Sequence, residues 1–100
     1  MNIQISSDAV AWYKNELDLA EGSYVRFFTR YGGSSTIQTG FSLGISIEEP
    51  VDVGTLIEKG GITFYIEEKD LWYFDGHNLL IEWKKDANEP VFRFTKTEEK

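Results

Sequence analysis

The chain has 100 residues, of which 41% are hydrophobic, 15% aromatic and 27% charged, and this composition predicts one folded domain over residues 1–100. The formal net charge of -7 disfavours binding to nucleic acid and to anionic membrane surfaces. No apolar run approaches the roughly 20 residues that span a bilayer, and the N-terminus lacks a signal-like core, so we expect a cytoplasmic protein.

Residues 6–22, with the sequence SSDAVAWYKNELDLAEG, predict the main helix. Ser6 or Ser7 can cap its start, Asp8 lies in the first turn near the positive end of the helix, and Gly22 is a stop signal. The apolar residues fall within one stripe of about 100°. They are Ala9, Val10, Tyr13, Leu17 and Ala20.

The period of the apolar residues changes to two after the helix. Residues 25–29 and 41–47 both alternate, which predicts the two strands of a hairpin. The second of these segments has small residues at every other position. We therefore expect a close neighbour on that face, either the helix or another subunit.

The second half of the chain predicts further short elements. An apolar run covers residues 62–66 after the turn sequence EKGG, and EEKDLWYF favours a short helical turn. The pair Asp75 and Gly76 favours a tight reversal between strands.

Two last strands are predicted around residues 79–83 and 90–95, before a charged tail from about residue 96 to 100 that should be mobile. The predicted fold class is therefore α+β. The helix comes first, and mostly antiparallel strands follow it in a small sandwich.

Cysteine is absent and histidine occurs once, at His77. The lack of thiols removes disulfides, thiolate nucleophiles and cysteine-ligated zinc or iron–sulfur clusters. One imidazole is too little for a conventional transition-metal site within one chain. We therefore predict no metal and no cofactor, and an enzyme would have to use carboxylates, hydroxyls, lysine and arginine.

The segment RYGGSSTIQTG contains the candidate ligand-binding residues Arg30, Gly32, Gly33, Ser34 and Ser35. Two adjacent glycines could form a backbone nest for an anion, assisted by the guanidinium and the hydroxyls. Phosphate-binding fingerprints, however, place such a turn before a helix, whereas this loop joins two predicted strands. A plain hairpin connection is the main interpretation, and anion binding is the alternative.

Neither the carboxylates nor His77 indicates an active site. Acidic residues cluster near predicted turns, where they are typically solvated, and no spacing selects a catalytic pair. An Asp-His arrangement at residues 75–77 could orient an imidazole base, but no nucleophile is tied to it. We expect no enzymatic activity, and a carboxylate and histidine enzyme is the least favoured hypothesis.

The large aromatic residues are the feature most above expectation. Trp72, Tyr73, Phe74 and Trp83 lie close together in the sequence, and Trp12 lies at the flank of the helical stripe. A small core cannot easily enclose all of them, although core packing explains most. We therefore predict that Trp12, Trp72 and Trp83 are candidates for a contact with a protein partner or with a second copy in a homodimer.

The order of these elements resembles the HesB/IscA-like family of small A-type iron–sulfur biogenesis proteins. The resemblance covers nearly the whole chain and rests on the helix ISSDAVAWYKNEL, the strand and loop YVRFFTRYGGSS, and LWYFDGHNLLIEW followed by NEPVFRFT. It implies the family's fold. In that family, one cysteine in the glycine-rich loop and a Cys-Gly-Cys after the last strand bind iron or a cluster between subunits.

This chain departs from the family at all three cysteine positions. The loop position corresponds to Gly33, within one residue, and KTEEK follows the last strand. Ser34 and Ser35 are poor substitutes because an alcohol stays protonated near neutral pH. We therefore expect a non-catalytic interaction or accessory protein with a link to iron–sulfur cluster biogenesis, and a small-ligand-binding module is the alternative.

Overall fold

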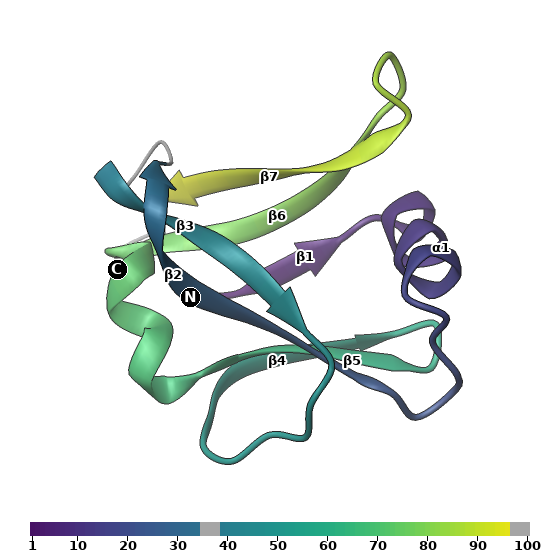
Figure 1. Ribbon diagram of the computed structural model, residues 1–100, viewed down its shortest axis with the longest axis horizontal. Helices are drawn as coiled ribbons and strands as arrows, with labels where there is room; N and C mark the ends of the chain where they lie inside the picture. Colours follow the sequence, from purple (N-terminus) through teal and green to yellow (C-terminus); the bar gives the residue numbers. More distant parts are fainter. Residues whose placement is uncertain (35–38, 97–100) are drawn as a thin grey trace.

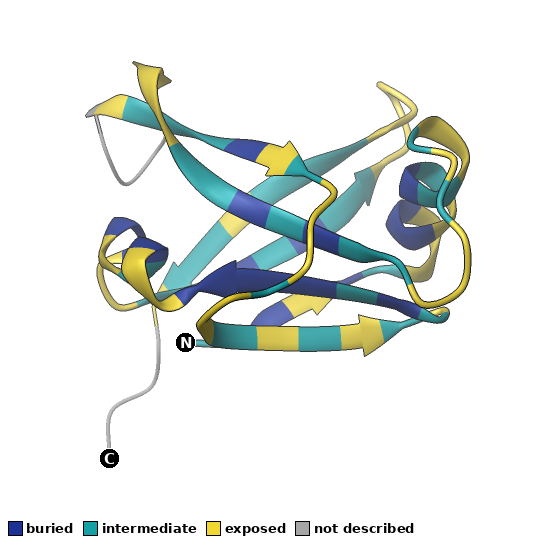
Figure 2. Cartoon of the chain, turned by 60° about the horizontal axis from the view of Figure 1, so that its bottom comes forward, coloured by how far each residue is buried: buried dark blue, intermediate teal, exposed yellow. Residues whose placement is uncertain are grey.

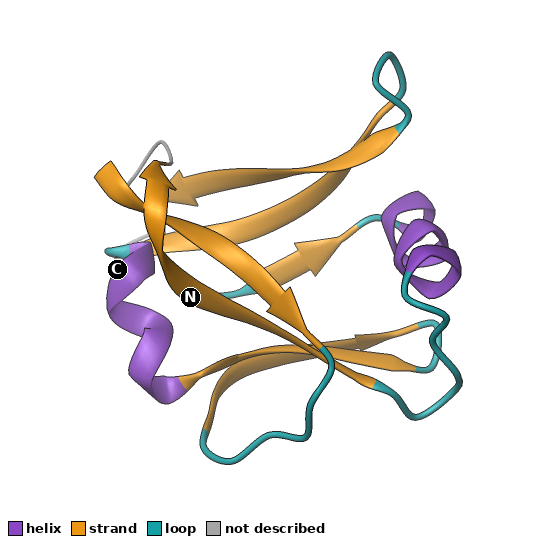
Figure 3. Ribbon diagram, viewed as in Figure 1, coloured by secondary structure: helices purple, strands orange, loops and turns teal. Residues whose placement is uncertain are grey.

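The computed structural model describes residues 1–34 and 39–96 and has an α+β fold (Figures 1 and 3). Its strands form a three-stranded sheet of order β1-β6-β7 and a four-stranded sheet of order β3-β2-β5-β4. Helix α1 lies at one end of the sheets and the 3-10 helix η1 at the other (Figure 1). The elements are β1 (Ile3–Ile5), α1 (Ser7–Glu16), β2 (Tyr24–Ser34), β3 (Thr39–Ser46), β4 (Val53–Lys59), β5 (Ile62–Glu67), η1 (Glu68–Phe74), β6 (His77–Lys84) and β7 (Glu89–Lys96).

Helix α1 begins where the sequence predicts. The Ser6 side chain accepts a hydrogen bond from the backbone N–H of Ala9, so Ser6 is the N-cap, and Asp8 lies in the first turn. The helix ends at Glu16, earlier than the predicted stop at Gly22. Asp18 has a φ of 54°, and this left-handed residue turns the chain before the glycine is reached.

Antiparallel pairing dominates, as predicted, but two contacts are parallel. β2 with β3, β4 with β5, and β6 with β7 are antiparallel. β1 pairs with β6 and β2 pairs with β5 in parallel. The predicted hairpin of β2 and β3 is confirmed, as are the strands at β5, β6 and β7 and the helical turn at η1.

The core lies between the two sheets and under both helices (Figure 2). Phe27 of β2 is fully buried, and its ring lies 5.7 Å from that of Phe92 in the opposite sheet. Tyr73 and Phe74 of η1 bury their rings beside Phe94, at centroid distances of 6.3 and 6.1 Å. These aromatic contacts join the two sheets and explain where most of the large side chains reside.

Two strands were not predicted from the sequence. The predicted N-terminal helix is confirmed as α1, but the three-residue strand β1 precedes it. β4 forms an edge strand of seven residues, although Pro50 and Gly54 are residues that typically interrupt a strand pattern. The predicted mobile tail lies largely outside the described residues. Within the described ranges, no helix is long and apolar enough to cross a membrane.

Candidate functional site

Three aromatic side chains line up at the end of the β2–β3 hairpin nearest η1. The Phe41 ring in β3 lies 5.3 Å from the ring of Tyr31 and also 5.3 Å from the ring of Trp72. Tyr31 is 88% exposed and Trp72 is 52% exposed. Phe41 is half-buried between them. We call Tyr31, Phe41 and Trp72 the aromatic surface, and the exposure of its two outer members is typical of residues that contact another protein.

The structure separates the three predicted interface tryptophans. Trp72 is exposed, whereas Trp12 and Trp83 are half-buried. Trp12 packs its edge against Tyr13, with ring centroids 5.2 Å apart, and covers the margin of the core. Sequence reasoning missed Tyr31, and the only available signal was its place in a long segment without charged residues.

The glycine-rich loop begins with a bulge in the hairpin. Tyr31 pairs with Phe41 and Ser34 pairs with Thr39, so β2 has one more residue than β3 between these pairs. Gly32 and Gly33 occupy that segment with φ values of 100° and 67°, and glycine adopts such values without a steric penalty. The glycines therefore have a structural role in the hairpin that requires no ligand.

The proposed anion site remains a prediction. Arg30 is exposed, Gly32 and Gly33 lie beside it in the bulge, and the side chain of Ser34 and the whole of Ser35 lie outside the described residues. Arg30 pairs with Ser42 in β3.

Gly33→Cys introduces a cysteine where the family resemblance implies one, within one residue, and should destabilise the fold by about 1 kcal/mol. The φ of 67° causes this cost, because the nearest atoms to an added Cβ are those of Ser42 at 3.5 Å, an ordinary contact. Urea denaturation would measure it. Gly33→Asn is the control and should cost less, because asparagine tolerates left-handed backbone. Equal stability of Gly33→Cys and wild type would contradict the assigned backbone conformation.

A second cluster joins one arginine to three carboxylates. Arg26 of β2 donates to the Asp70 carboxylate at 2.9 Å and lies 3.5 Å from a carboxylate oxygen of Glu48. Glu67 accepts hydrogen bonds from the backbone N–H groups of Val51 and Asp52, both at 2.8 Å. We call Arg26, Glu48, Glu67 and Asp70 the arginine–carboxylate cluster. It fastens residues 47–52, which connect β3 to β4, onto the outer face of the sheet.

This cluster corrects the expectation that the carboxylates are solvated. Glu67 and Asp70 are both buried. The Val51 hydrogen bond is the largest cause of a lowered pKa of Glu67, burial opposes it, and the Asp52 hydrogen bond and the charge of Arg26 lower the pKa further. Burial lowers the pKa of Arg26, but the hydrogen bond and charge of Asp70 outweigh it, so the net shift is upward.

The chemistry of the cluster is that of an ion-pair network. Three of its members line a surface cavity of about 290 Å³. The lining is Arg26, Glu48, Glu67, Val51, Asp52 and Lys69. The lowered pKa of Glu67 and the raised pKa of Arg26 keep these two side chains charged near neutral pH. A general acid would instead need a raised carboxyl pKa, so the lowered pKa of Glu67 does not suit it to donate a proton.

His77 is held by backbone atoms. Its Nδ1 lies 2.9 Å from the carbonyl oxygen of Phe74 and 3.1 Å from that of Asp75. Both contacts are to backbone carbonyl oxygens, whereas the predicted Asp-His orientation of a base would use the Asp75 carboxylate. Within the described ranges, no group of three or more histidine, aspartate or glutamate side chains could hold a metal ion.

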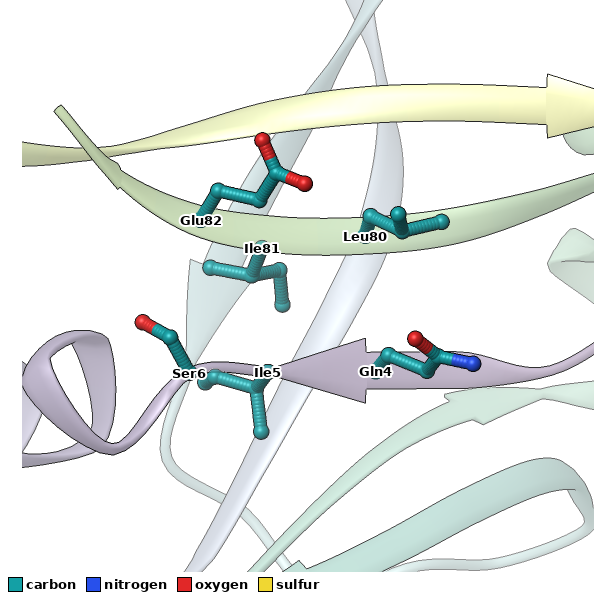
Figure 4. Close-up of a pocket in the computed structure, with 6 residues that line it drawn as sticks. All are labelled: Gln4, Ile5, Ser6, Leu80, Ile81 and Glu82. Atoms are coloured by element: carbon teal, nitrogen blue, oxygen red, sulfur yellow. The ribbon is translucent and has the colours of Figure 1, made fainter.

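A shallow hollow of about 210 Å³ lies along the parallel contact of β1 with β6 (Figure 4). Ser6 is already used as the cap of α1. Glu82 accepts a hydrogen bond from Arg93 at 3.0 Å. These two polar side chains therefore have local structural partners, and the hollow offers little chemistry for a ligand. Its lining is Gln4, Ile5, Ser6, Leu80, Ile81 and Glu82.

The chain is similar to proteins of one family along almost its entire length. A family model described as iron-sulphur cluster biosynthesis matches residues 1–97. A Bacillus subtilis protein named pyruvate dehydrogenase inhibitor is 56% identical over 94 residues, covering 94% of this chain and 99% of the relative. An uncharacterised protein of Staphylococcus saprophyticus is 46% identical over 94 residues, covering 91% and 92% of the two chains.

The fold is also found in a solved structure. Escherichia coli SufA, described as involved in the biosynthesis of iron–sulfur clusters, matches with a TM-score of 0.61 and 14% sequence identity. The match covers 99% of this chain and 83% of that chain. At this identity the likeness establishes a shared fold and nothing about shared chemistry.

Proposed function

Because the chain belongs to the iron-sulphur cluster biosynthesis family but contains no cysteine, we propose that it acts as a non-catalytic regulator that binds and inhibits pyruvate dehydrogenase. The observation that carries this proposal is the 56% identity to a protein named for that inhibition. The two chains align over nearly their full lengths, so the similarity does not come from one shared segment.

The chemistry of the chain supports regulation by protein contact. Cluster transfer in a cysteine-ligated family requires thiolates, and the sequence has none. The arginine–carboxylate cluster is an ion-pair network, and His77 is held by carbonyl groups. What the described surface does present is exposed aromatic area, which is a common energetic centre of protein interfaces.

The inhibition is tested with the purified chain and pyruvate dehydrogenase from the same organism. We expect the rate of pyruvate oxidation to fall as the chain is added, and the two proteins to co-sediment. An accessory role in iron–sulfur cluster assembly is the second candidate, favoured by the family match over residues 1–97. It predicts no effect on the pyruvate dehydrogenase rate, so absence of inhibition would reject the first proposal and favour the second.

Trp72→Ala should raise the inhibition constant at least about tenfold, equivalent to about 1.4 kcal/mol of binding free energy. Trp72 is the large, half-exposed member of the aromatic surface. Val51→Ala is the control, because Val51 is apolar and 91% exposed but lies outside that surface. Inhibition titrations of wild type and both variants provide the measurement.

The inhibition titrations of the two variants test the proposed contact surface separately from the proposed inhibition. If the wild-type chain inhibits and Trp72→Ala inhibits equally well, the aromatic surface is the wrong contact and the function stands. If Val51→Ala weakens inhibition and Trp72→Ala does not, the contact lies nearer residues 47–52. Thermal denaturation of each variant checks that the loss is not caused by unfolding.

A further inference from the structure

A surface cavity of about 240 Å³ lies between helix α1 and the turn that joins β4 to β5. In Figure 1, α1 lies above the end of the β4–β5 hairpin. The cavity is smaller than the roughly 300–1,000 Å³ of pockets that hold drug-sized ligands, so its size suits an ion or a small metabolite. Its lining is Ser7, Val10, Ala11, Lys14, Lys59 and Gly60.

One face of α1 forms the first wall of this cavity. Its four lining residues are at positions i, i+3, i+4 and i+7 of the helix, a spacing that places side chains on one face. Val10 is buried in the core, and Lys14 is half-buried beside it. The helix therefore brings an apolar surface and an ammonium group to the same cavity.

The end of β4 supplies a second ammonium group. Lys59 is the last residue of β4 and is half-buried. Its Nζ donates a hydrogen bond to the backbone oxygen of Ile5 at 2.6 Å. An ammonium group has three donors, so this contact holds the Lys59 side chain in place and leaves two donors for a ligand.

Gly60 keeps the space in front of Lys14 free. A Cβ on Gly60 would lie 3.0 Å from a methyl carbon of Val10 and 3.7 Å from Nζ of Lys14. A side chain at this position would therefore point toward the ammonium group. The φ of 65° also favours glycine here.

The charge of this cavity differs from that of the cavity at the arginine–carboxylate cluster. That cavity is lined by three acidic residues beside its cations, whereas the described lining of this one contains two lysines and no acidic residue. Glu21 reaches the same turn, because a Cβ on Gly61 would lie 3.3 Å from its Oε2. Even so, within residues 1–34 and 39–96 neither Lys14 nor Lys59 forms an ion pair.

Two ammonium groups that line one cavity repel each other, and salt screens half-buried charges less than exposed ones. A bound anion would replace this repulsion with attraction to both groups. The chain as a whole has a net charge of -7 and repels anions. Two cations without carboxylate partners are therefore a local exception to the field of the protein.

We infer that Lys14 and Lys59 form a binding site for a small oxyanion, which is phosphate or the carboxylate of a molecule with a short apolar part. The two ammonium groups would contact the charged oxygens, and Val10 and Ala11 would contact the apolar part. The inference is independent of the proposed inhibition of pyruvate dehydrogenase, because its test measures binding to the chain without the enzyme.

Separate titrations with inorganic phosphate and with propionate test the site. The backbone amide NMR signals of Lys14 and Gly60 report binding, and a constant ionic strength separates it from general screening. We expect a saturable shift with a dissociation constant of at most about 10 mM for at least one probe. The probe that saturates identifies the oxyanion, and the absence of saturation with both probes would overturn the proposal.

Lys14→Gln should raise the dissociation constant at least about tenfold, because glutamine suits a helix but carries no charge. Lys84→Gln is the matched control: it removes the same charge from an exposed residue outside the cavity, and its dissociation constant should stay within about twofold of wild type. An unchanged affinity of Lys14→Gln, or an equal loss in Lys84→Gln, would overturn the proposal.

Ala11→Leu tests the cavity while both charges are kept. Ala11 is exposed at the rim of the cavity, and the larger side chain should occupy part of the space and weaken binding at least about threefold. Thermal denaturation checks that each variant is folded. Wild-type affinity in Ala11→Leu would mean that the anion binds outside the cavity, which also contradicts the proposal.

Discussion

Phe27→Ala should lower the free energy of unfolding by about 3–5 kcal/mol, the usual range for a phenylalanine removed from a packed core. Phe27 has no exposed surface, and its ring stacks on Phe64 at 6.1 Å. It also meets the edges of Tyr13 and Phe92 at 6.3 and 5.7 Å. The substitution would therefore remove contacts with the helix, with the same sheet and with the opposite sheet.

The loss would be a large part of the total, because domains are stable by only about 5–15 kcal/mol. Tyr31→Ala is the matched control: it removes an aromatic ring from the same strand, but Tyr31 is mostly exposed. Its cost should stay within about 0.5 kcal/mol. Urea unfolding of both variants gives the comparison, and similar stabilities would mean that Phe27 is not at the centre of the core.

The elements that could be predicted from the sequence are those that a local pattern specifies, such as an alternation of apolar residues or a helix cap. The alternation of residues 25–29 and 41–47 predicts the hairpin of β2 and β3, and the Ser6 cap predicts the start of α1. β1 is too short for its alternation to be distinguished from chance. In β4 the pairing register shifts between Val53 and Thr55. The apolar residues of β4 therefore lack the strict period of two that would predict a strand from the sequence.

The parallel contacts and the arginine–carboxylate cluster depend on distant parts of the chain. Arg26 and Asp70 are 44 residues apart, and no local rule brings them together. Glu67 and Asp70 stand near a turn, where carboxylates are usually solvated. Glu67 is held by backbone hydrogen bonds from Val51 and Asp52, and Asp70 is held by Arg26.

The aromatic surface also depends partly on composition and partly on contacts between distant parts of the chain. Trp72 could be proposed as an exposed residue because the core was too small for every ring. Its proximity to Tyr31 and Phe41 arises from the packing of η1 beside the hairpin. Sequence reasoning therefore identified one member of the surface, and the other two needed the fold.

Arg26→Met should lower the free energy of unfolding by about 2–3 kcal/mol at neutral pH, because it leaves the Asp70 carboxylate without its charged donor. The side chains of Arg26 and Asp70 are only 16% and 11% exposed, so water replaces the lost partner poorly. Methionine retains much of the aliphatic stem, which limits the loss of packing, although it removes the guanidinium that lies 5.5 Å from the centroid of the Phe28 ring.

The control is Arg93→Met, which removes a salt bridge with Glu82 whose two side chains are 59% and 41% exposed. That pair should contribute less than about 1 kcal/mol. Denaturant unfolding at pH 7 compares the two variants. If Arg93→Met destabilises the chain as much as Arg26→Met does, the arginine–carboxylate cluster does not stabilise the fold more than an exposed salt bridge.

Acid should reduce the difference between wild type and Arg26→Met. The folded pKa of Glu67 lies below its ordinary value of 4.5, so its stabilisation is present above that value and is lost as pH falls through the folded pKa. Arg26 is one cause of the lowering, so its removal brings the folded pKa closer to the unfolded one. The variant therefore loses less stability than wild type on acidification, and a difference that stays constant from pH 7 to about pH 3 would contradict this coupling.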